Sequence, residues 1–305
     1  MKLKHLFIYV ILGWFVFPLM RAFAQEASVT IEVLTTFEYP NSRATYPQKI
    51  NDAGDITGYF YDELGARRGF VRFANGHFSR PIAEPNDNLD FTFASGINNQ
   101  RTLCGVYETQ PDFVVHSFFL SDRTFSEFDV AGALNTWIFG INDAGNFCGY
   151  IDEGGTGGSS GFVNIGGSTT LFSVAGAPTT FVFGMNNLNQ SVGCATLGGL
   201  TRAFIRDADG TLTFPIHVPG ARGTVLNDIN DRRWAVGKYW LSGSRFFHAV
   251  FFQMGSNFVT FDYPGARETI FTGINGHGLI CGYYGDGSGN TGVGILARVS
   301  RVPAD

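Results

Sequence analysis

The chain has 305 residues and a formal net charge of −5 at pH 7; 40 residues are Gly and 15% are aromatic. The acidic balance excludes the basic surface that nucleic-acid-binding proteins need, so we expect no nucleic-acid partner. An aromatic, Gly-rich sequence without a sustained helical period is typical of short β-strands joined by tight turns.

Residues 1–24 resemble a secretory signal peptide. Lys2 and Lys4 form a polar start, residues 6–20 are apolar, and Ala22 and Ala24 are the small residues that a signal peptidase reads. We predict cleavage before Gln25, a secreted or periplasmic location, and a single domain over residues 25–305. An uncleaved anchor is the alternative. Because the 15 apolar residues are fewer than the roughly 20 that span a membrane, we expect no stable membrane insertion.

A short motif recurs six times in the remaining chain. Its third copy, residues 141–150, reads INDAGNFCGY. The copies follow one another at steps of 44 to 47 residues and begin at Ile50, Ile97, Ile141, Met185, Ile229 and Ile274. A period of this length is the signature of a repeat architecture.

Each repeat reads as four short strands. In the third repeat the β-forming runs are residues 136–142, 147–151, 161–165 and 170–174, and Gly, Asn and Asp separate them. Six units of four antiparallel strands predict an all-β fold, a six-bladed β-propeller.

The two chain ends share one repeat. The last repeat has three predicted strands, residues 270–275, 279–284 and 293–299, and no fourth. Residues 36–45 match residues 260–269 without a gap, so we predict that the N-terminal strand completes the last blade. Such closure would protect a sheet edge and tie down both ends, whereas a linear solenoid gives no reason for a split unit.

Two polar residues recur in every repeat. The Asn that follows the first motif residue begins a hairpin, where its side chain can bond to backbone two residues on and fix the turn; a ring of ligands is the alternative. These are Asn51, Asn98, Asn142, Asn186, Asn230 and Asn275. The second recurring residue opens each innermost strand, where its hydroxyl could bond to the neighbouring blade or face the channel: Thr45, Thr92, Thr136, Thr180, Thr224 and Thr269.

The four cysteines follow the repeat. Cys104, Cys148 and Cys281 share a slot that other repeats fill with Val or Thr, and Cys194 lies two residues beyond it. We therefore predict free buried thiols rather than disulfides. No CxxC or Cys/His spacing is present, so we predict no metal site and no cofactor.

The pattern Ile-Asn-x-x-Gly-x-x-x-Gly-Tyr, followed by a strand related to His-Ala-Phe, resembles the bacterial extracellular HAF repeat family over the whole mature chain. The triplet varies, as in residues 116–118 (HSF), 202–204 (RAF) and 248–250 (HAV), and residues 293–295 (VGI) depart from it. The resemblance implies a secreted repeat protein and carries no catalytic residue.

The connections between the second and third strands of each repeat vary in length and chemistry, and variable loops on a rigid scaffold are where binding usually occurs. Aromatic rings and polar groups near this face suit a glycan or a protein partner, and we expect a monomer. The candidate binding residues are Tyr59, Tyr61, Tyr107, His116, Tyr150, Arg202, Tyr239, Trp240, His248, Tyr283 and Tyr284.

Charge on this face predicts two arcs. Acidic side chains come from repeats one, two, three and six, whereas Arg202, Lys238 and Arg245 come from repeats four and five. The alternative function is a carbohydrate-active hydrolase or lyase, in which paired carboxylates work with His116 or His248. Its candidate carboxylates are Glu63, Glu108 and Glu153.

Overall fold

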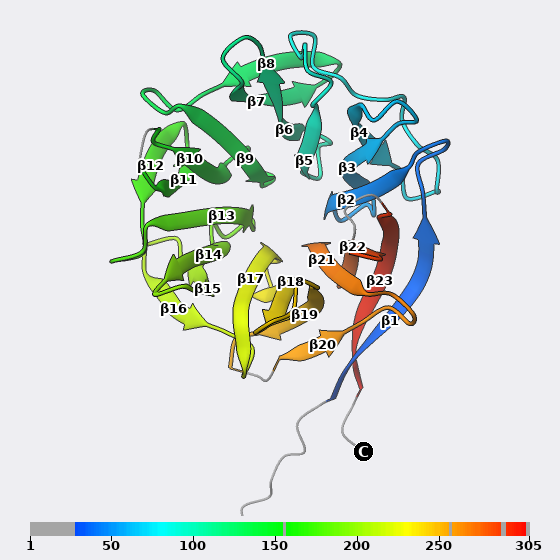
Figure 1. Cartoon of the computed structure of the whole chain (residues 1–305), viewed down its shortest axis with the longest axis vertical. Coiled ribbons are helices and arrows are strands. Elements are labelled where there is room, and N and C mark those ends of the chain that lie inside the picture. Colours follow the sequence, from blue (N-terminus) through cyan, green and yellow to red (C-terminus); the bar gives the residue numbers. More distant parts are fainter. Residues whose placement is uncertain (1–27, 155–156, 256–257, 288–290, 303–305) are drawn as a thin grey trace, which may run out of the picture.

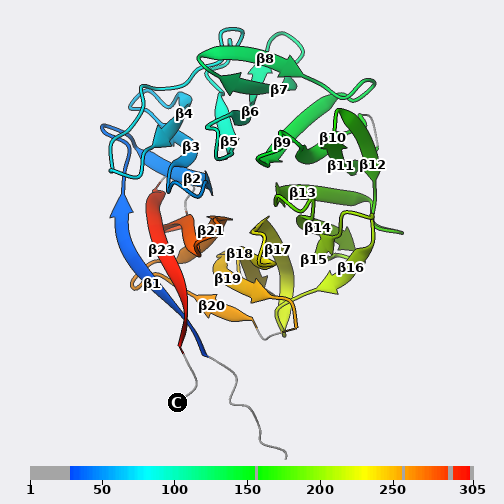
Figure 2. The same ribbon diagram turned by 180° about the vertical axis from the view of Figure 1, so that it is seen from behind.

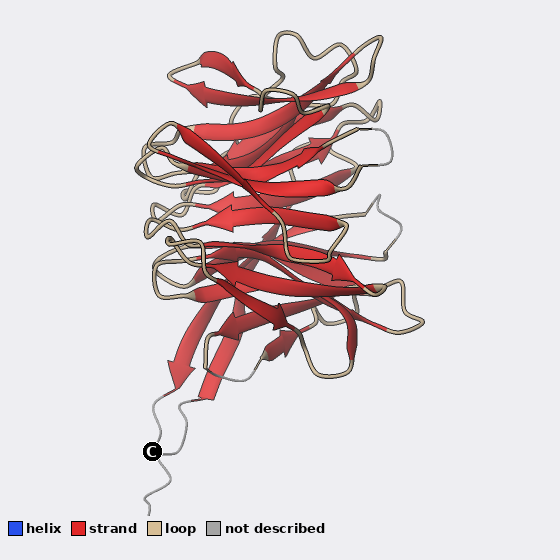
Figure 3. Cartoon of the chain, turned by 90° about the vertical axis from the view of Figure 1, so that its left-hand side faces the viewer, coloured by secondary structure: helices blue, strands red, loops and turns tan. Residues whose placement is uncertain are grey.

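The computed structural model of the protein describes residues 28–154, 157–255, 258–287 and 291–302, which form 23 β-strands and no helix. Figure 3 shows strands joined only by loops. Accordingly, none of these residues belongs to a helix that could cross a membrane. The all-β prediction is confirmed. The predicted signal peptide and its cleavage point lie outside the described residues.

The strands form a ring around a central axis (Figure 1), and the view from behind shows the same order (Figure 2). Each repeat contributes one strand next to the axis. These innermost strands are β2 (Ala44–Ile50), β5 (Phe93–Ile97), β9 (Asn135–Ile141), β13 (Thr179–Met185), β17 (Ala221–Ile229) and β21 (Glu268–Ile274).

Antiparallel pairing continues outward from each innermost strand. The second strands are β3 (Ile56–Tyr61), β6 (Leu103–Thr109), β10 (Phe147–Asp152), β14 (Ser191–Leu197), β18 (Trp234–Leu241) and β22 (Leu279–Gly285). The third strands are β4 (Arg67–Arg72), β7 (Val114–Ser121), β11 (Ser159–Ile165), β15 (Leu200–Arg206), β19 (His248–Gln253) and β23 (Val293–Val302). The outermost strands are β1 (Ser28–Phe37), β8 (Thr124–Phe128), β12 (Ser168–Phe172), β16 (Leu212–Ile216) and β20 (Val259–Phe261).

The N-terminal strand completes the last repeat, as predicted. β1 runs antiparallel to β23, with Ser28 opposite Val302 and Phe37 opposite Gly294. Figure 1 shows the start of β1 beside the end of β23 at the rim of the ring. The strand begins earlier than the sequence match at Thr36 suggested. Residues 36–45 hold only the last two residues of β1, the connection that follows and the first two residues of β2.

The regular pattern of four strands in six separate sheets is only partly present. In the first repeat β4 is followed by isolated bridges, Gly69 to Ile82 and Arg72 to Phe78, in place of a fourth strand. The strands β9 to β20 count as one 12-stranded sheet, because single parallel bridges join β11 to β13 and β15 to β17. The coarser prediction, an all-β propeller-like ring, holds.

The six recurring asparagines join the repeats in a closed ring of hydrogen bonds. Each side-chain amide donates to the backbone carbonyl of the next Asn at 2.8–3.2 Å, and Asn275 closes the ring by donating to Asn51. The side-chain oxygen accepts from the backbone four residues on, as from Asn146 to Asn142 at 3.0 Å. The predicted turn role is therefore confirmed, and the same side chain also connects the repeats.

The recurring threonines tie down the connections that lead into the innermost strands. Thr136 Oγ1 accepts a hydrogen bond from the backbone N–H of Val130 at 3.0 Å, and Thr224 accepts one from Val218 at 3.0 Å. All six are buried. The hydroxyl thus binds the segment arriving from the preceding repeat, so the predicted bond to the neighbouring blade is confirmed.

The second Gly of the motif is required by close contact between strands. A Cβ at Gly149 would lie 1.8 Å from the carbonyl oxygen of Trp137, and one at Gly193 would lie 1.8 Å from that of Phe181. Beneath this crossing lies the third residue of the His-Ala-Phe-like triplet, which is buried in every repeat: Phe70, Phe118, Phe162, Phe204, Val250 and Ile295. The second Gly of the motif therefore marks the position where two strand backbones and a core side chain are in contact.

The cysteines are buried and unpaired, as predicted. Burial raises the pKa of the Cys104 and Cys281 thiols to about 12, so both are neutral at physiological pH. The equivalent Val192 and Val236 are equally inaccessible. The slot thus selects for a small apolar volume.

We expect Asn142→Ala to lower the free energy of unfolding by about 2–3 kcal/mol, because the buried Asn186 carbonyl and the turn amides lose their partner. Asn142→Asp keeps the turn acceptor and removes the donor to the ring. Guanidinium unfolding measures both variants, with Asn75→Ala as the control, since Asn75 is exposed and bonds only within its own turn. An equal effect of Asn142→Ala and Asn75→Ala would contradict the ring's role.

Candidate functional site: the central channel

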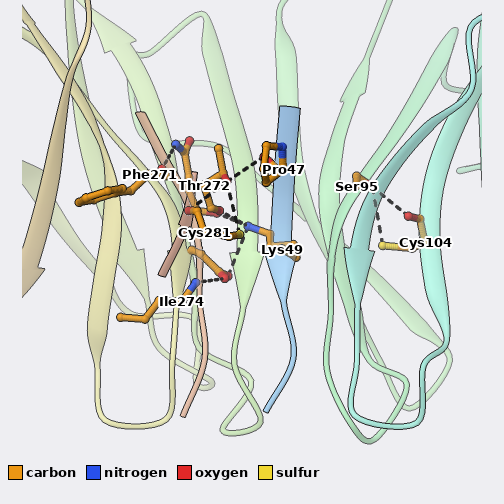
Figure 4. A network of polar contacts seen from close by, with 10 residues as sticks. Pro47, Lys49, Ser95, Cys104, Phe271, Thr272, Ile274 and Cys281 are labelled. Carbon is orange, nitrogen blue, oxygen red and sulfur yellow. Dashed lines mark hydrogen bonds and ion pairs between the residues drawn. The ribbon is translucent and has the colours of Figure 1, made fainter. Parts of the chain in front are cut away.

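A buried ion pair divides the central channel. The residue before each motif is Gly in four repeats, but Lys49 in the first and Asp228 in the fifth. Lys49 Nζ lies 3.3 Å from Asp228 Oδ1, and each side chain is only 9% exposed. Figure 4 shows the Lys49 amine directed toward Thr272, to whose carbonyl oxygen it donates at 3.2 Å.

The surroundings of this pair are built to hold it. The backbone N–H of Ile274 donates to Asp228 Oδ2 at 3.0 Å. A Cβ at Gly184 would lie 2.6 Å from Asp228 Oδ1, so Gly leaves room for the carboxylate. Burial raises the pKa of Asp228, and the Lys49 ammonium opposes that rise.

On one side of the ion pair lies a polar recess of about 80 Å³, lined by the hairpin turns of the six repeats. The residue after each recurring Asn faces it, and these side chains hydrogen-bond around the mouth. Asn99 bridges Asp52 and Asp143 through its amide nitrogen, at 3.1 and 2.8 Å. Asn187 bridges Asp143 and Asp231 in the same way. The mouth of the recess is therefore surrounded by side chains that hydrogen-bond to one another.

On the other side lies a larger space, the wide cavity, of about 630 Å³. It extends toward the β14–β15 and β18–β19 connections, which is the face that the sequence predicts to bind. Eight aromatic residues line it: Tyr59, Phe93, Phe139, Phe181, Phe183, Trp240, Phe247 and Tyr283. Polar groups between the rings include the amides of Gln48 and Asn227, the amine of Lys238 and the hydroxyls of Thr196, Thr201, Ser244 and Thr272.

A β-bulge in every innermost strand marks one set of these positions. The pairing with the second strand skips one residue in each repeat, two before the motif. A bulge re-aims the side chain at that point. Five of the six skipped residues line the wide cavity: Gln48, Phe139, Phe183, Asn227 and Thr272.

Ring-to-ring contacts stiffen the wall. Tyr59 packs edge-on against Phe93 with centroids 4.8 Å apart, and Phe93 meets Phe139 at 5.8 Å. A second layer lies behind: Tyr150 stacks on Phe139 at 5.7 Å, and Tyr61 meets Tyr59 at 5.9 Å. Tyr61 and Tyr150, predicted to bind, therefore support the wall without lining it.

Trp240 occupies a prepared position on β18. Gly223, opposite it on β17, has no side chain there; a Cβ would lie 2.0 Å from the indole. Phe247 contacts the indole edge-on at 5.6 Å. Trp240, Tyr59 and Tyr283 are the three predicted binding residues that line the wide cavity.

Lys238 lines the wide cavity and, like Arg245, forms no ion pair with another described residue. Its Nζ lies 4.3 Å above the ring of Phe247. Burial lowers the pKa of Lys238, whereas Cys194 and Glu268 act in the opposite direction. Burial raises the pKa of the Cys194 thiol to about 12, so this cavity-lining cysteine is not an activated nucleophile.

Four other predicted residues form two equivalent pairs away from the cavity lining, Tyr107 with His116 and Tyr239 with His248. The rings are stacked or tilted, 5.4 and 5.0 Å apart. Each imidazole Nδ1 faces a carboxylate, at 2.6 Å for His116 and Asp129 and at 2.9 Å for His248 and Asp262. The structure does not bring these four together with the channel aromatics, because alternate strand positions face opposite sides of a sheet.

In the second repeat this arrangement includes a further acid. Ligand atoms of His116, Glu127 and Asp129 lie within 4.8 Å of one another, close enough to hold a metal ion. Tyr107 Oη donates to Glu127 at 2.7 Å. The sequence predicts no metal site here, because these three residues have no recognisable spacing.

The last two predicted residues have structural partners. Tyr284 stacks on Tyr263 with centroids 3.8 Å apart. Arg202 Nη1 donates to the backbone carbonyls of Thr201 and Arg222 at 3.0 and 2.9 Å. Neither lines the wide cavity, because both side chains pair with neighbouring segments.

No carboxylate of the described residues lines the wide cavity. Glu63 and Glu153 are exposed in their connections, and Glu108 is half-buried in β6. A mechanism with two carboxylates needs both beside one substrate bond. The hypothesis of a hydrolase using Glu63, Glu108 and Glu153 therefore finds no support in this cavity.

The site predicted from the sequence did not include the Phe residues of the cavity lining, the position of Lys238 in the cavity or the bulge in each innermost strand. A usable signal was present: aromatic residues alternate before the Gly that precedes the motif, as at Phe181 and Phe183. A period of two predicts that both side chains share one side of the strand. Only the ring arrangement shows that this side faces the channel.

No family model and no curated protein sequence match the chain. Solved structures match in fold. A TolB structure from Agrobacterium tumefaciens has a TM-score of 0.59 at 11% identity, covering 90% of this chain and 99% of that one. The Aleuria aurantia lectin in complex with α-methyl-L-fucoside has a TM-score of 0.53 at 12% identity, covering 88% of this chain and 97% of that one. TolB from Acinetobacter baumannii has a TM-score of 0.52 at 10% identity, covering 85% of this chain and 66% of that one.

The chain has a β-propeller-like fold. At such low identity the likeness concerns the fold alone, and it transfers no ligand and no residue role. The relation to HAF repeat proteins stays an interpretation of the sequence.

Lys49→Met should lower the free energy of unfolding by about 3–5 kcal/mol at pH 7, because it leaves the Asp228 carboxylate buried without its partner. Since the folded-state pKa of Asp228 lies above its unfolded value, protonation favours the folded state. The contribution of Asp228 protonation to the free energy of unfolding is complete below about pH 4 and is lost as the pH rises through the folded-state pKa. Urea unfolding at pH 4.5 and 7 measures both effects.

The double variant Lys49→Met/Asp228→Asn is the control, because it removes both charges. We expect it to recover much of the loss at pH 7. A destabilisation by Lys49→Met that is the same at both pH values would show that the lost packing, rather than the bare carboxylate, causes it.

Proposed function

We propose that the protein is a binding module that holds a glycan in the wide cavity. The observation that carries this proposal is the lining: eight aromatic rings with amide, hydroxyl and amine groups between them. The apolar face of a sugar ring packs on an aromatic ring, while its hydroxyl groups need hydrogen-bonding partners. The volume of about 630 Å³ lies within the range of about 300–1,000 Å³ typical of ligand pockets.

A regular six-bladed scaffold is part of the proposal. Its support is the sixfold ring of Asn hydrogen bonds, which joins six equivalent hairpins irrespective of how many strands lie outside each. The lectin with bound α-methyl-L-fucoside is an example of a similar fold that accommodates a sugar. Export through the signal peptide, cleavage before Gln25 and a monomeric state also remain proposals drawn from the sequence.

We expect Trp240→Ala to weaken glycan binding about 30-fold, because it removes roughly 2 kcal/mol of ring packing at the cavity wall. A glycan array with residues 25–305 identifies the ligand, and calorimetry measures the change in affinity. Tyr239→Leu is the matched control: Tyr239 adjoins Trp240 on β18 but packs against His248. Equal effects of the two substitutions, with both variants folded, would remove the wide cavity from the proposal.

A protein partner is the second candidate, favoured by exposed apolar side chains on the same face. Large hydrophobic residues at the tips of the connections are 40% or more exposed: Leu64, Phe113, Leu134, Leu197, Leu200 and Leu241. Clustered exposed apolar groups mark interaction surfaces. A partner that covers this face would bury them around the cavity mouth.

If a protein binds there, the double variant Phe113→Asp/Leu200→Asp should lose at least about tenfold in affinity for that protein, because charge replaces buried apolar contacts. Capture from envelope extracts followed by mass spectrometry identifies the partner. Leu188→Asp is the control, since exposed Leu188 lies in the hairpin turn of the opposite face. Equal capture by both variants would reject this candidate.

A further inference from the structure

The charge of the wide cavity is one-sided. Its charged lining residues are Lys49, Lys238 and Arg245, and none of the described lining residues is acidic. Lys49 is neutralised by Asp228. The two remaining cations therefore set the sign of the field inside the cavity.

Lys238 projects its amine into this space from the middle of β18. Its backbone pairs with Val225 on one side and Ala249 on the other, which fixes where the side chain begins. The ammonium lies over the Phe247 ring at 4.3 Å, and such a contact offsets only part of the cost of removing a cation from water. Within the described part of the chain, no carboxylate oxygen lies within 4.0 Å of Nζ.

The nearby titratable groups leave this charge largely uncompensated. Glu268, half-buried at the start of β21, acts on Lys238 from beyond ion-pair distance, and Asp286 acts in turn on Glu268. Cys194 is a neutral thiol. An anionic group entering the wide cavity would therefore gain a charge-assisted hydrogen bond without displacing an existing partner, and its negative charge would oppose the lowering of the Lys238 pKa by burial.

Arg245 adds a second cation nearer the mouth. It is exposed in the β18–β19 connection, and its guanidinium lies 5.2 Å from the Phe246 ring. Trp240 and Phe247 line the same cavity, and Phe247 contacts both the Lys238 amine and the Trp240 indole. A ligand with an apolar ring face and an anionic edge fits this set of groups.

We propose that the glycan bound in the wide cavity is acidic, with its carboxylate held by the Lys238 ammonium and its ring packed on Trp240. This inference rests on the proposed glycan-binding function and names the chemical class of the ligand. Arg245 attracts the anion at the mouth and contributes less, because its charge is exposed to water and screened by salt.

The first experiment is a glycan array that contains uronate-bearing glycans and neutral counterparts that differ only in a carboxylate or hydroxymethyl group at C6. Preference for the acidic members supports the inference. Binding of neutral glycans equally or better overturns it and leaves glycan binding intact. Binding of no glycan overturns both the inference and the proposed function.

The second experiment measures affinity by calorimetry for p-nitrophenyl glucuronide and p-nitrophenyl glucoside. We expect the wild type to prefer the glucuronide by at least about tenfold. Lys238→Met should abolish that preference while keeping affinity for the glucoside, and Lys238→Arg should retain most of it. Arg202→Met removes an equal charge outside the lining and should change neither; a preference that survives Lys238→Met overturns the inference.

Discussion

The ring of hydrogen bonds between six asparagines holds the arrangement together. Each side chain accepts from its own hairpin turn and donates to the next repeat, so one residue fixes both local geometry and the spacing between neighbours. Because Asn275 donates to Asn51, the last repeat is bonded to the first as firmly as any other pair. Pairing of β1 with β23 adds a second closure at the rim.

Closure of the ring places the six innermost strands so near one another that most repeats carry Gly beside the axis. At two positions this rule is broken, and Lys49 and Asp228 meet across the space that the glycines leave. The ion pair separates two environments with different chemistry. The polar recess is lined by side chains that hydrogen-bond to one another, whereas the wide cavity retains an amine and amides among aromatic rings.

This asymmetry assigns different roles to the two faces. The hairpin face repeats the same turn six times, and its polar groups form hydrogen bonds within the scaffold. The opposite face carries connections of differing length, exposed apolar tips and the opening of the wide cavity. The mixture of ring faces, hydrogen-bonding groups and an uncompensated cation is suited to a small acidic sugar, while the surrounding tips could also contact a larger partner.

The sequence by itself determined the repeat, the β-strands, the turn role of Asn142 and its equivalents, and the free buried cysteines, because these depend on local geometry and on periodicity. It also determined that the N-terminal strand joins the last repeat, since residues 36–45 align with residues 260–269 without a gap. The Asn side chain's bond to the next repeat was not visible, because it depends on distances between units.

Only the tertiary structure decided which aromatic residues share a cavity. Tyr239 and Trp240 are adjacent in sequence, yet one packs on His248 and the other lines the channel, because neighbouring strand residues face opposite sides. Bulges then re-aim Phe139 and its equivalents toward the axis. Lys238 appeared in the sequence as one surface charge among several, and the ring of strands buried it among aromatic rings. Burial, and the lack of an ion pair with any described carboxylate, are relations between repeats, which the order of residues does not contain.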